Sequence, residues 1–172
     1  MSLKQALYFC DANSTDEMLT IYSHFSTEKK FESDLIECLA RNDLEESASW
    51  ILKHHLEQGF MLASKFESMV IKAFFNMDHW EARLHILQIL PLVQIAYEQT
   101  EDLWHHVEKQ TRDKNKLIRA WSYNGLHAIA TQHSNYKDKA THYLKKALDE
   151  ESAASVLVRI KKIMSAGDYE QS

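Results

Sequence analysis

Ten histidines are the residues of this 172-residue chain best suited to bind a metal ion or to exchange a proton near neutral pH. A helical metal site needs ligands on one face at i and i+3 or i+4, or ligands converging from several helices. Adjacent histidines point about 100° apart on a helix, and two histidines six residues apart also lie on different faces of it. The closely spaced histidines are His54 with His55, His105 with His106, His79 with His85, and His127 with His133. The spacing favours solvated or locally hydrogen-bonded imidazoles, and we expect no metal-binding residues.

Adjacent carboxylates are the second group that could do acid–base chemistry. They occur at Glu45/Glu46, Glu101/Asp102 and Glu150/Glu151. Each pair falls near an expected helix end, and close to an N-terminus a negative charge is stabilised by the helix dipole. The sequence has no G-x-S-x-G motif, no glycine-rich phosphate loop and no cysteine in a recognisable catalytic context. We therefore expect no catalytic residue and no cofactor, which points away from an enzyme.

Helices must position these side chains, because 3 Gly and 1 Pro are too few turn-formers for a many-stranded sheet. Residues 78–93 are apolar on most sides and predict a central helix. The same layout returns about 36 residues later at 116–130, where Arg119 takes the place of Arg83, and about 37 residues further on at 153–164. This period predicts stacked helical pairs in an all-α fold. With 45% hydrophobic and 26% charged residues, one folded domain over 1–172 is expected.

Several polar residues predict where these helices begin and end. Asn135 is placed to cap the N-terminus of the helix that follows it. Gly59 is placed to end a helix, and Pro91 should bend or terminate the last turn of the central helix. Residues with the spacing of capping boxes are Ser14 with Glu17, Asp43 with Glu46, and Asp78 with Glu81.

The apolar stripes alternate in width along the chain. The helices expected at 78–93, 116–130 and 153–164 have wide apolar faces, and narrower faces separate them. With an Arg early in the first helix of a pair and short turns, residues 43–166 resemble HEAT-like and armadillo-like repeats. The resemblance implies a right-handed α-α superhelix of about four to five stacked helical pairs. Residues 1–42 would then be an atypical N-terminal cap, and residues 167–172 a frayed tail.

The resemblance also brings one class of enzyme into consideration. HEAT-like DNA glycosylases, which remove alkylated bases, line a concave groove with Lys and Arg and use Trp and Asp residues around the lesion. In this chain Trp104 and Asp102 could take such places, but their spacing is not diagnostic. The net charge is −5, and the helices expected to line the groove sum to about −1. Nucleic acid is therefore an unfavoured partner, and a divergent nucleic-acid-binding or glycosylase-like repair protein stays as the alternative.

Repeat stacks usually bind proteins or peptides through an extended surface. Long polar and aromatic side chains on the helices expected at 98–113 and after Asn135 make a mixed-charge surface suited to such a partner. Its expected partner-binding residues are Trp104, His105, Lys109, Arg112, His142, Lys145 and Lys146. We predict an adaptor module without catalytic activity, and a homodimer stays open. A helical bundle that encloses a small ligand is a third option, which would show as a cavity among the fourth to eighth helices.

The start of the sequence bears on location. Its six-residue apolar run, broken by Asp11, is too short for a signal-peptide core or a membrane span. Cys10 and Cys38 have neither metal-ligand spacing nor the density of a disulfide scaffold, so we expect both to be reduced and buried. These features predict a cytoplasmic protein with no membrane partner.

Overall fold

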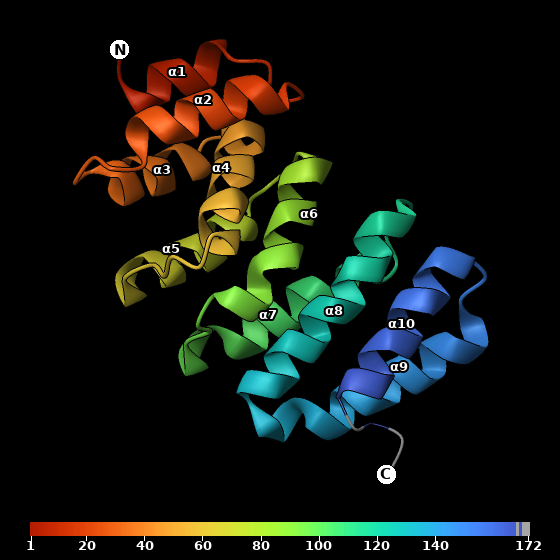
Figure 1. Cartoon of the computed structure of the whole chain (residues 1–172). Coiled ribbons are helices and arrows are strands. Elements are labelled where there is room, and N and C mark those ends of the chain that lie inside the picture. The colour runs from red at the N-terminus through yellow and green to blue at the C-terminus, as the bar shows by residue number, and fades with distance from the viewer. Residues whose placement is uncertain (168, 170–172) are drawn as a thin grey trace. The chain divides into compact units, whose positions relative to one another are not determined.

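The computed structural model describes residues 1–167 and 169, and within them the fold is all-α, with ten α-helices, two short 3-10 helices and no strand (Figure 1). The prediction of an all-α fold is confirmed. The tail expected at 167–172 lies, except for Gly167 and Tyr169, outside the described residues. None of the described helices is long and apolar enough to span a membrane. Contacts divide the chain into two compact units, Met1–Val93 and Gln94–Ser172, which we call the N-terminal and C-terminal units.

The N-terminal unit is built from helices that pack on the helix two positions further along the chain. Thus α1 contacts α3, α2 contacts α4, α3 contacts α5, and α4 contacts α6. The apolar side chains between these helices are almost completely buried, which supplies the main driving force for their packing. The elements are α1 (Leu3–Phe9), α2 (Thr15–Phe25), α3 (Phe31–Leu39), α4 (Glu45–Glu57), α5 (Ser64–Phe74), α6 (Trp80–Ile89) and the 3-10 helix η1 (Leu90–Leu92).

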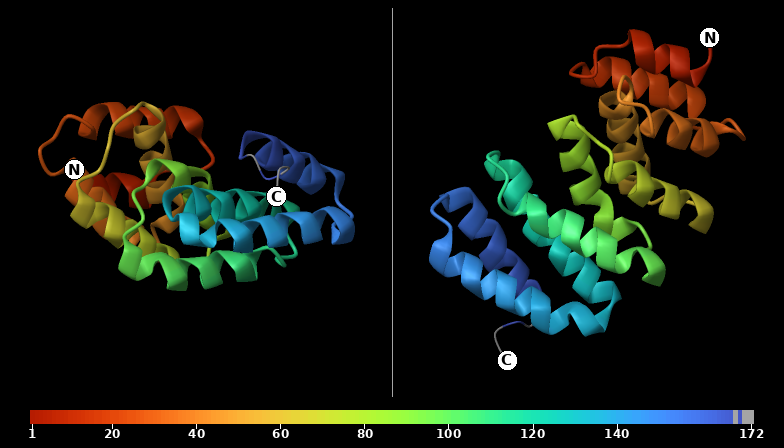
Figure 2. Two further views of the ribbon diagram at one scale, coloured as in Figure 1. Left: turned by 90° about the horizontal axis from the view of Figure 1, so that it is seen from below. Right: turned by 180° about the vertical axis from the view of Figure 1, so that it is seen from behind.

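The C-terminal unit is arranged around one long helix, α8. Its partners α7, α9 and α10 all contact it, and the contact with α10 is the most extensive (Figure 2). The wide apolar face expected at 116–130 is confirmed, because side chains from Ile118 to Ala130 are buried on several sides of α8. The elements are α7 (Tyr97–Gln110), α8 (Lys116–Gln132), the 3-10 helix η2 (Ser134–Tyr136), α9 (Lys137–Glu150) and α10 (Ala154–Ala166).

Two of the expected helix ends are confirmed. The Ser14 hydroxyl accepts a hydrogen bond from the Glu17 amide at 3.4 Å and caps α2. Gly59 follows α4 with φ +89, the left-handed region in which a side chain is strained. Pro91 lies in η1, immediately after α6 ends at Ile89, so the expected termination of the central helix is also confirmed.

Three of the expected N-terminal caps are wrong, although helices begin near each of them. Asp43 pairs with Arg41 at 2.7 Å, and α4 has no side-chain cap. Asp78 does not cap α6; the buried Glu45 carboxylate of α4 accepts the amides of Asp78, at 3.0 Å, and of His79. Asn135 lies inside η2, and no side chain caps α9. In the case of α6, a carboxylate brought from another helix supplies the acceptor that a local cap would have supplied.

Residues about one sequence period apart contact each other inside each unit. The Asn42 amide donates to the Asp78 carboxylate at 3.0 Å, and the Ser49 hydroxyl lies 3.0 Å from Nδ1 of His85; both pairs are 36 residues apart. In the C-terminal unit, the Tyr143 hydroxyl donates to Glu108, 35 residues earlier. The first two pairs join α4 and the loop before it to α6 and its start, and the third joins α7 to α9.

The two cysteines are free thiols. Cys38 is buried as expected, and burial raises the pKa of its thiol to about 11. Cys10 is only partly buried, so its expected burial holds in part.

Candidate functional site

The expected partner-binding residues lie on α7, in the turn directly after it and on α9, and all but one of them are exposed. Six of them are exposed: His105, Lys109, Arg112, His142, Lys145 and Lys146. Trp104 is fully buried, at 0% exposure, so its expected contact with a partner is wrong. We refer to the six exposed residues as the α7–α9 surface.

Trp104 instead packs in the interior beneath the α7–α9 surface. Its ring packs 5.2 Å from the ring of Tyr136 and edge-on to Tyr143 at 5.9 Å. The ammonium group of Lys139 lies 4.8 Å from the indole centroid, which adds a cation–π interaction. The helical spacing of Leu103, Trp104 and Val107 places all three on the buried stripe of α7.

A second contact between α7 and α9 is polar. The Tyr143 hydroxyl donates a hydrogen bond to the Glu108 carboxylate. Burial and this hydrogen bond to an anion raise the pKa of Tyr143 to about 12, so the phenol keeps its proton. His105 lies 3.6 Å from Glu108 on the same helix. The two helices are thus held together both by an edge-on ring contact between Trp104 and Tyr143 and by a charge-assisted hydrogen bond.

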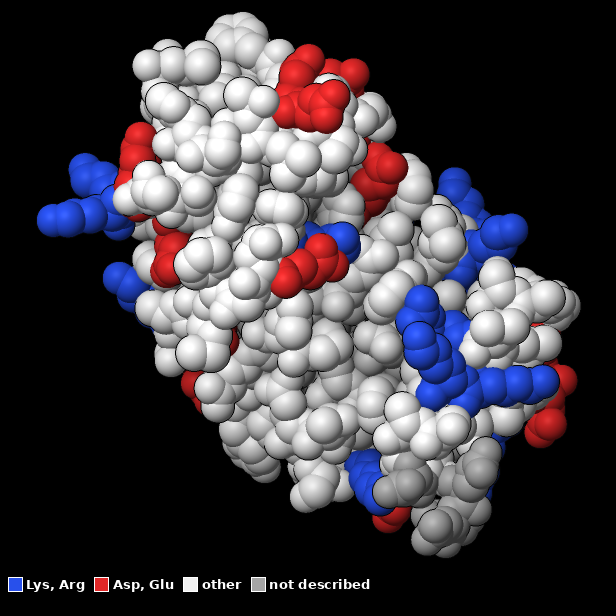
Figure 3. Space-filling view, in the orientation of Figure 1, with Lys and Arg blue, Asp and Glu red and all other residues white. Residues whose placement is uncertain are grey.

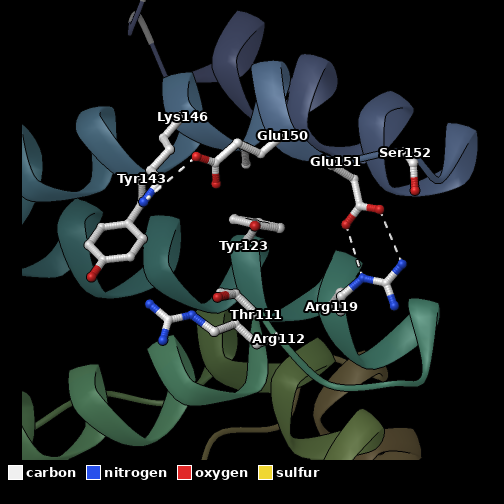
Figure 4. Close-up of a pocket in the computed structure, with 10 residues that line it drawn as sticks. Thr111, Arg112, Arg119, Tyr123, Tyr143, Lys146, Glu150, Glu151 and Ser152 are labelled. Carbon is white, nitrogen blue, oxygen red and sulfur yellow. Dashed lines mark hydrogen bonds and ion pairs between the residues drawn. The ribbon is translucent and has the colours of Figure 1, made fainter.

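A cleft of about 340 Å³ opens at one end of the α7–α9 surface (Figure 4). The end of α7 supplies Arg112 to one wall, and α9 supplies Tyr143 and Lys146 to the opposite wall, with Tyr123 of α8 between them. The lining residues are Thr111, Arg112, Arg119, Tyr123, Tyr143, Lys146, Ala147, Glu150, Glu151 and Ser152. Two of the expected residues, Arg112 and Lys146, therefore face a shared cavity.

The charged groups of the cleft differ in how far they are already neutralised. Arg119 forms a two-point ion pair with Glu151 at 2.9 and 3.1 Å, and this pairing lowers the pKa of the Glu151 carboxyl. Lys146 lies 3.8 Å from Glu150, and both side chains are more than half exposed. Within the described part of the chain, Arg112 forms no ion pair. The guanidinium of Arg112 is therefore the cation most available to an incoming anion.

Another surface of the C-terminal unit was not among the expected sites. Both α8 and α10 carry basic residues and no Asp or Glu, and Figure 3 shows Lys and Arg side chains over this part of the unit. Arg159 of α10 stacks on the Trp121 ring of α8 at 3.9 Å. Leu117 and Val158 are exposed apolar side chains on the same two helices, at 42% and 67%. The absence of acidic residues from these two helices is visible in the sequence and could have indicated this surface.

No protein-family model, curated protein or solved structure matches this chain. What the α7–α9 surface can bind therefore follows from the geometry and charge of its own side chains.

Proposed function

We propose that this protein is a non-enzymatic adaptor module that binds a protein or peptide partner through the α7–α9 surface. In this proposal the helices form a HEAT-like, right-handed superhelix within one repeat domain. The hydrogen bonds between residues one period apart, and the packing of each N-terminal helix on the helix two positions further on, support stacked pairs.

The observation that carries the proposal is the cleft between Arg112 and Lys146. A guanidinium presents a planar fork that matches the two oxygens of a carboxylate, and Lys146 can add a second positive charge from the opposite wall. The rings of Tyr123 and Tyr143 provide apolar walls that exclude water around the paired charges. The cleft suits an Asp or Glu side chain, or a C-terminal carboxylate, of a partner protein.

The rest of the surface suits the same kind of partner. Lys109 and His142 are exposed near the cleft, while exposed acidic residues such as Glu101 and Asp149 lie on the same two helices, so the flanking surface is of mixed charge. Exposed charges of this kind increase the association rate and select orientation more than they add affinity. A peptide with an acidic anchor is the partner we propose.

A nucleic-acid-binding protein is the second candidate, and the surface of α8 and α10 favours it. The basic residues of two helices that carry no Asp or Glu of their own, together with the Trp121–Arg159 stack, could bind phosphates and a base. The buried Trp104 cannot stack on a flipped base as the glycosylase reading would require. The net charge of −5 also disfavours a polyanion. Binding to DNA that falls steeply with salt concentration would favour this candidate over the adaptor.

The proposal also includes a cytoplasmic location, where free thiols such as Cys10 and Cys38 are maintained. A homodimer is compatible with the adaptor function, and the mass of the purified protein in solution distinguishes it from a monomer.

Reversal of charge in the cleft tests the proposal. Tagged wild-type protein is expected to retain a stoichiometric protein partner from cell extract. The double variant Arg112→Glu/Lys146→Glu should lose that partner, whereas Lys72→Glu, an exposed lysine on α5, should keep it. Equal retention by both variants would contradict binding through the cleft. Loss of the partner from the control as well would mean that net charge alone determines the interaction.

A further inference from the structure

Two carboxylates and one imidazole converge in the N-terminal unit, away from the cleft. They are Glu46 in the first turn of α4, His79 directly before α6, and Glu81 in the first turn of α6. One ligand atom from each lies within 4.8 Å of the others, and Nε2 of His79 is 3.5 Å from the Glu46 carboxylate. All three side chains are partly buried. Glu46 and His79 are 33 residues apart in the sequence, so no local spacing indicates this group.

Helix capping, the usual role of acidic residues at helix starts, does not account for these two carboxylates. The Glu45 carboxylate already accepts the amides of Asp78 and His79 at the start of α6. Neither α4 nor α6 has a side-chain cap at its N-cap residue. Glu46 and Glu81 instead contact each other, and Glu46 also lies next to His79.

The surrounding hydrogen bonds fix the two helices relative to each other. Glu45 is 2% exposed and joins α4 to the start of α6, and Asn42 donates to Asp78 at 3.0 Å. One turn further on, Ser49 of α4 lies within 3.0 Å of His85 of α6. Outer contacts of this kind orient metal ligands before an ion binds. The three potential ligands therefore come from a framework whose geometry is set independently of them.

We propose that Glu46, His79 and Glu81 bind a divalent transition-metal ion, for which Zn²⁺ and Mn²⁺ are the natural probes. Imidazole and carboxylate together suit such ions, whereas Mg²⁺ and Ca²⁺ prefer oxygen ligands alone. Ligand atoms about 2.1 Å from a tetrahedral ion lie about 3.4 Å apart. Nε2 of His79 and the Glu46 carboxylate are already 3.5 Å apart, whereas the widest separation in the group, up to 4.8 Å, must shorten when the ion binds. Burial, a hydrogen bond with Glu46 and the charge of Glu46 raise the pKa of Glu81, and a cation between the two carboxylates would offset their repulsion.

Three protein ligands leave at least one coordination position for water or another molecule. A pocket of about 310 Å³, lined by two of the three residues, Glu46 and His79, lies beside the cluster. The site thus has the arrangement of an open metal centre, in contrast to a closed four-ligand structural site.

Metal binding by the full-length protein tests this proposal directly. After treatment with a chelator, the protein is dialysed against Mn²⁺ or Zn²⁺, and the bound metal is measured together with the shift in melting temperature. We expect one ion per chain and a rise in melting temperature on metal addition. The visible spectrum of the Co²⁺-loaded protein should show mixed nitrogen and oxygen ligation.

Substitution of the ligands separates a built site from adventitious binding. Glu81→Gln and His79→Gln should each weaken binding by about 10-fold or more. Glu81→Gln also removes a repulsive charge, so the metal-free variant should fold as well as wild type, which circular dichroism checks. Glu57→Gln, at the other end of α4, should leave binding unchanged. The proposal is overturned if wild type shows no saturable binding, or if both ligand variants bind the ion as tightly as wild type.

Discussion

Replacing Arg119 by methionine removes a two-point ion pair while keeping a side chain of similar length. The Arg119 guanidinium donates to Glu151 at 2.9 and 3.1 Å and to the backbone oxygens of Asp113 and Lys114 at 3.0 and 3.3 Å. It therefore connects the loop before α8 with the loop before α10. Loss of one partner from a fully buried pair costs about 3–5 kcal/mol. Because Arg119 is 20% exposed and Glu151 9% exposed, we expect Arg119→Met to lower the free energy of unfolding by about 2–3 kcal/mol.

Urea unfolding followed by circular dichroism measures this loss, and the exposed pair Arg41–Asp43 provides the control. Its N–O distance is shorter, 2.7 Å, but both side chains are more than 40% exposed, so Arg41→Met should change stability little. The outcome would refute the reasoning if Arg119→Met were no more destabilising than Arg41→Met. A double-mutant cycle with Glu151→Gln should give a coupling energy of about 1–2 kcal/mol.

The same pair predicts a dependence on pH. The hydrogen bond from Arg119 is the main reason that the pKa of Glu151 lies below its ordinary value of 4.5. The stabilisation is therefore fully present above about pH 4.5 and is lost as the pH falls through the lower pKa of the folded state. Wild type and Arg119→Met should become more similar in stability as the pH falls below 4.5. A constant difference across that range would contradict the assignment.

Three further predictions concern buried groups. Trp104→Ala should lower the free energy of unfolding in urea by about 3–5 kcal/mol, because the indole is fully buried, and Trp104→Phe should lower it less. A Trp104 variant that lost partner binding without losing stability would contradict the supporting role of this residue. Glu45→Ala should cost roughly 3 kcal/mol and speed hydrogen exchange at the amides of Asp78 and His79, which lose their acceptor. Burial, followed by the charge of Lys53, lowers the pKa of His85 to about 4, so stability should fall between about pH 6.5 and 4 as the unfolded chain takes up a proton first; His85→Gln should flatten that part of the pH profile.

The helical fold could be predicted from the sequence because each helix carries its own periodic apolar stripe. The wide face of α8 and the end of α6 before Pro91 follow from residues within a few positions of each other. The start of α6 could not be predicted in this way. Asp78 has the right spacing for a local cap, but its amide bonds to Glu45, 33 residues earlier, and only the packing of α4 on α6 creates that contact.

In the candidate site too, some features could be predicted from the sequence and others could not. Arg112, Lys146 and the other exposed residues of the α7–α9 surface were predicted from the polar faces of their helices. Trp104 was assigned to the surface for its residue type, although its spacing from Leu103 and Val107 indicates burial. The cleft itself required Tyr123 and Tyr143 to meet from α8 and α9, and no sequence spacing predicts that meeting.

The central claim is that a protein partner binds the α7–α9 surface, and site-specific photocrosslinking tests it most directly. A photoreactive residue is placed at Lys109 on α7, at Val158 on α10, or at Lys72 on α5, all of which are exposed. We predict that the position on α7 crosslinks to an acidic segment of a protein partner and that the position on α5 does not. Crosslinks only from the α10 position, or crosslinks to nucleic acid instead of protein, would contradict the proposed adaptor surface.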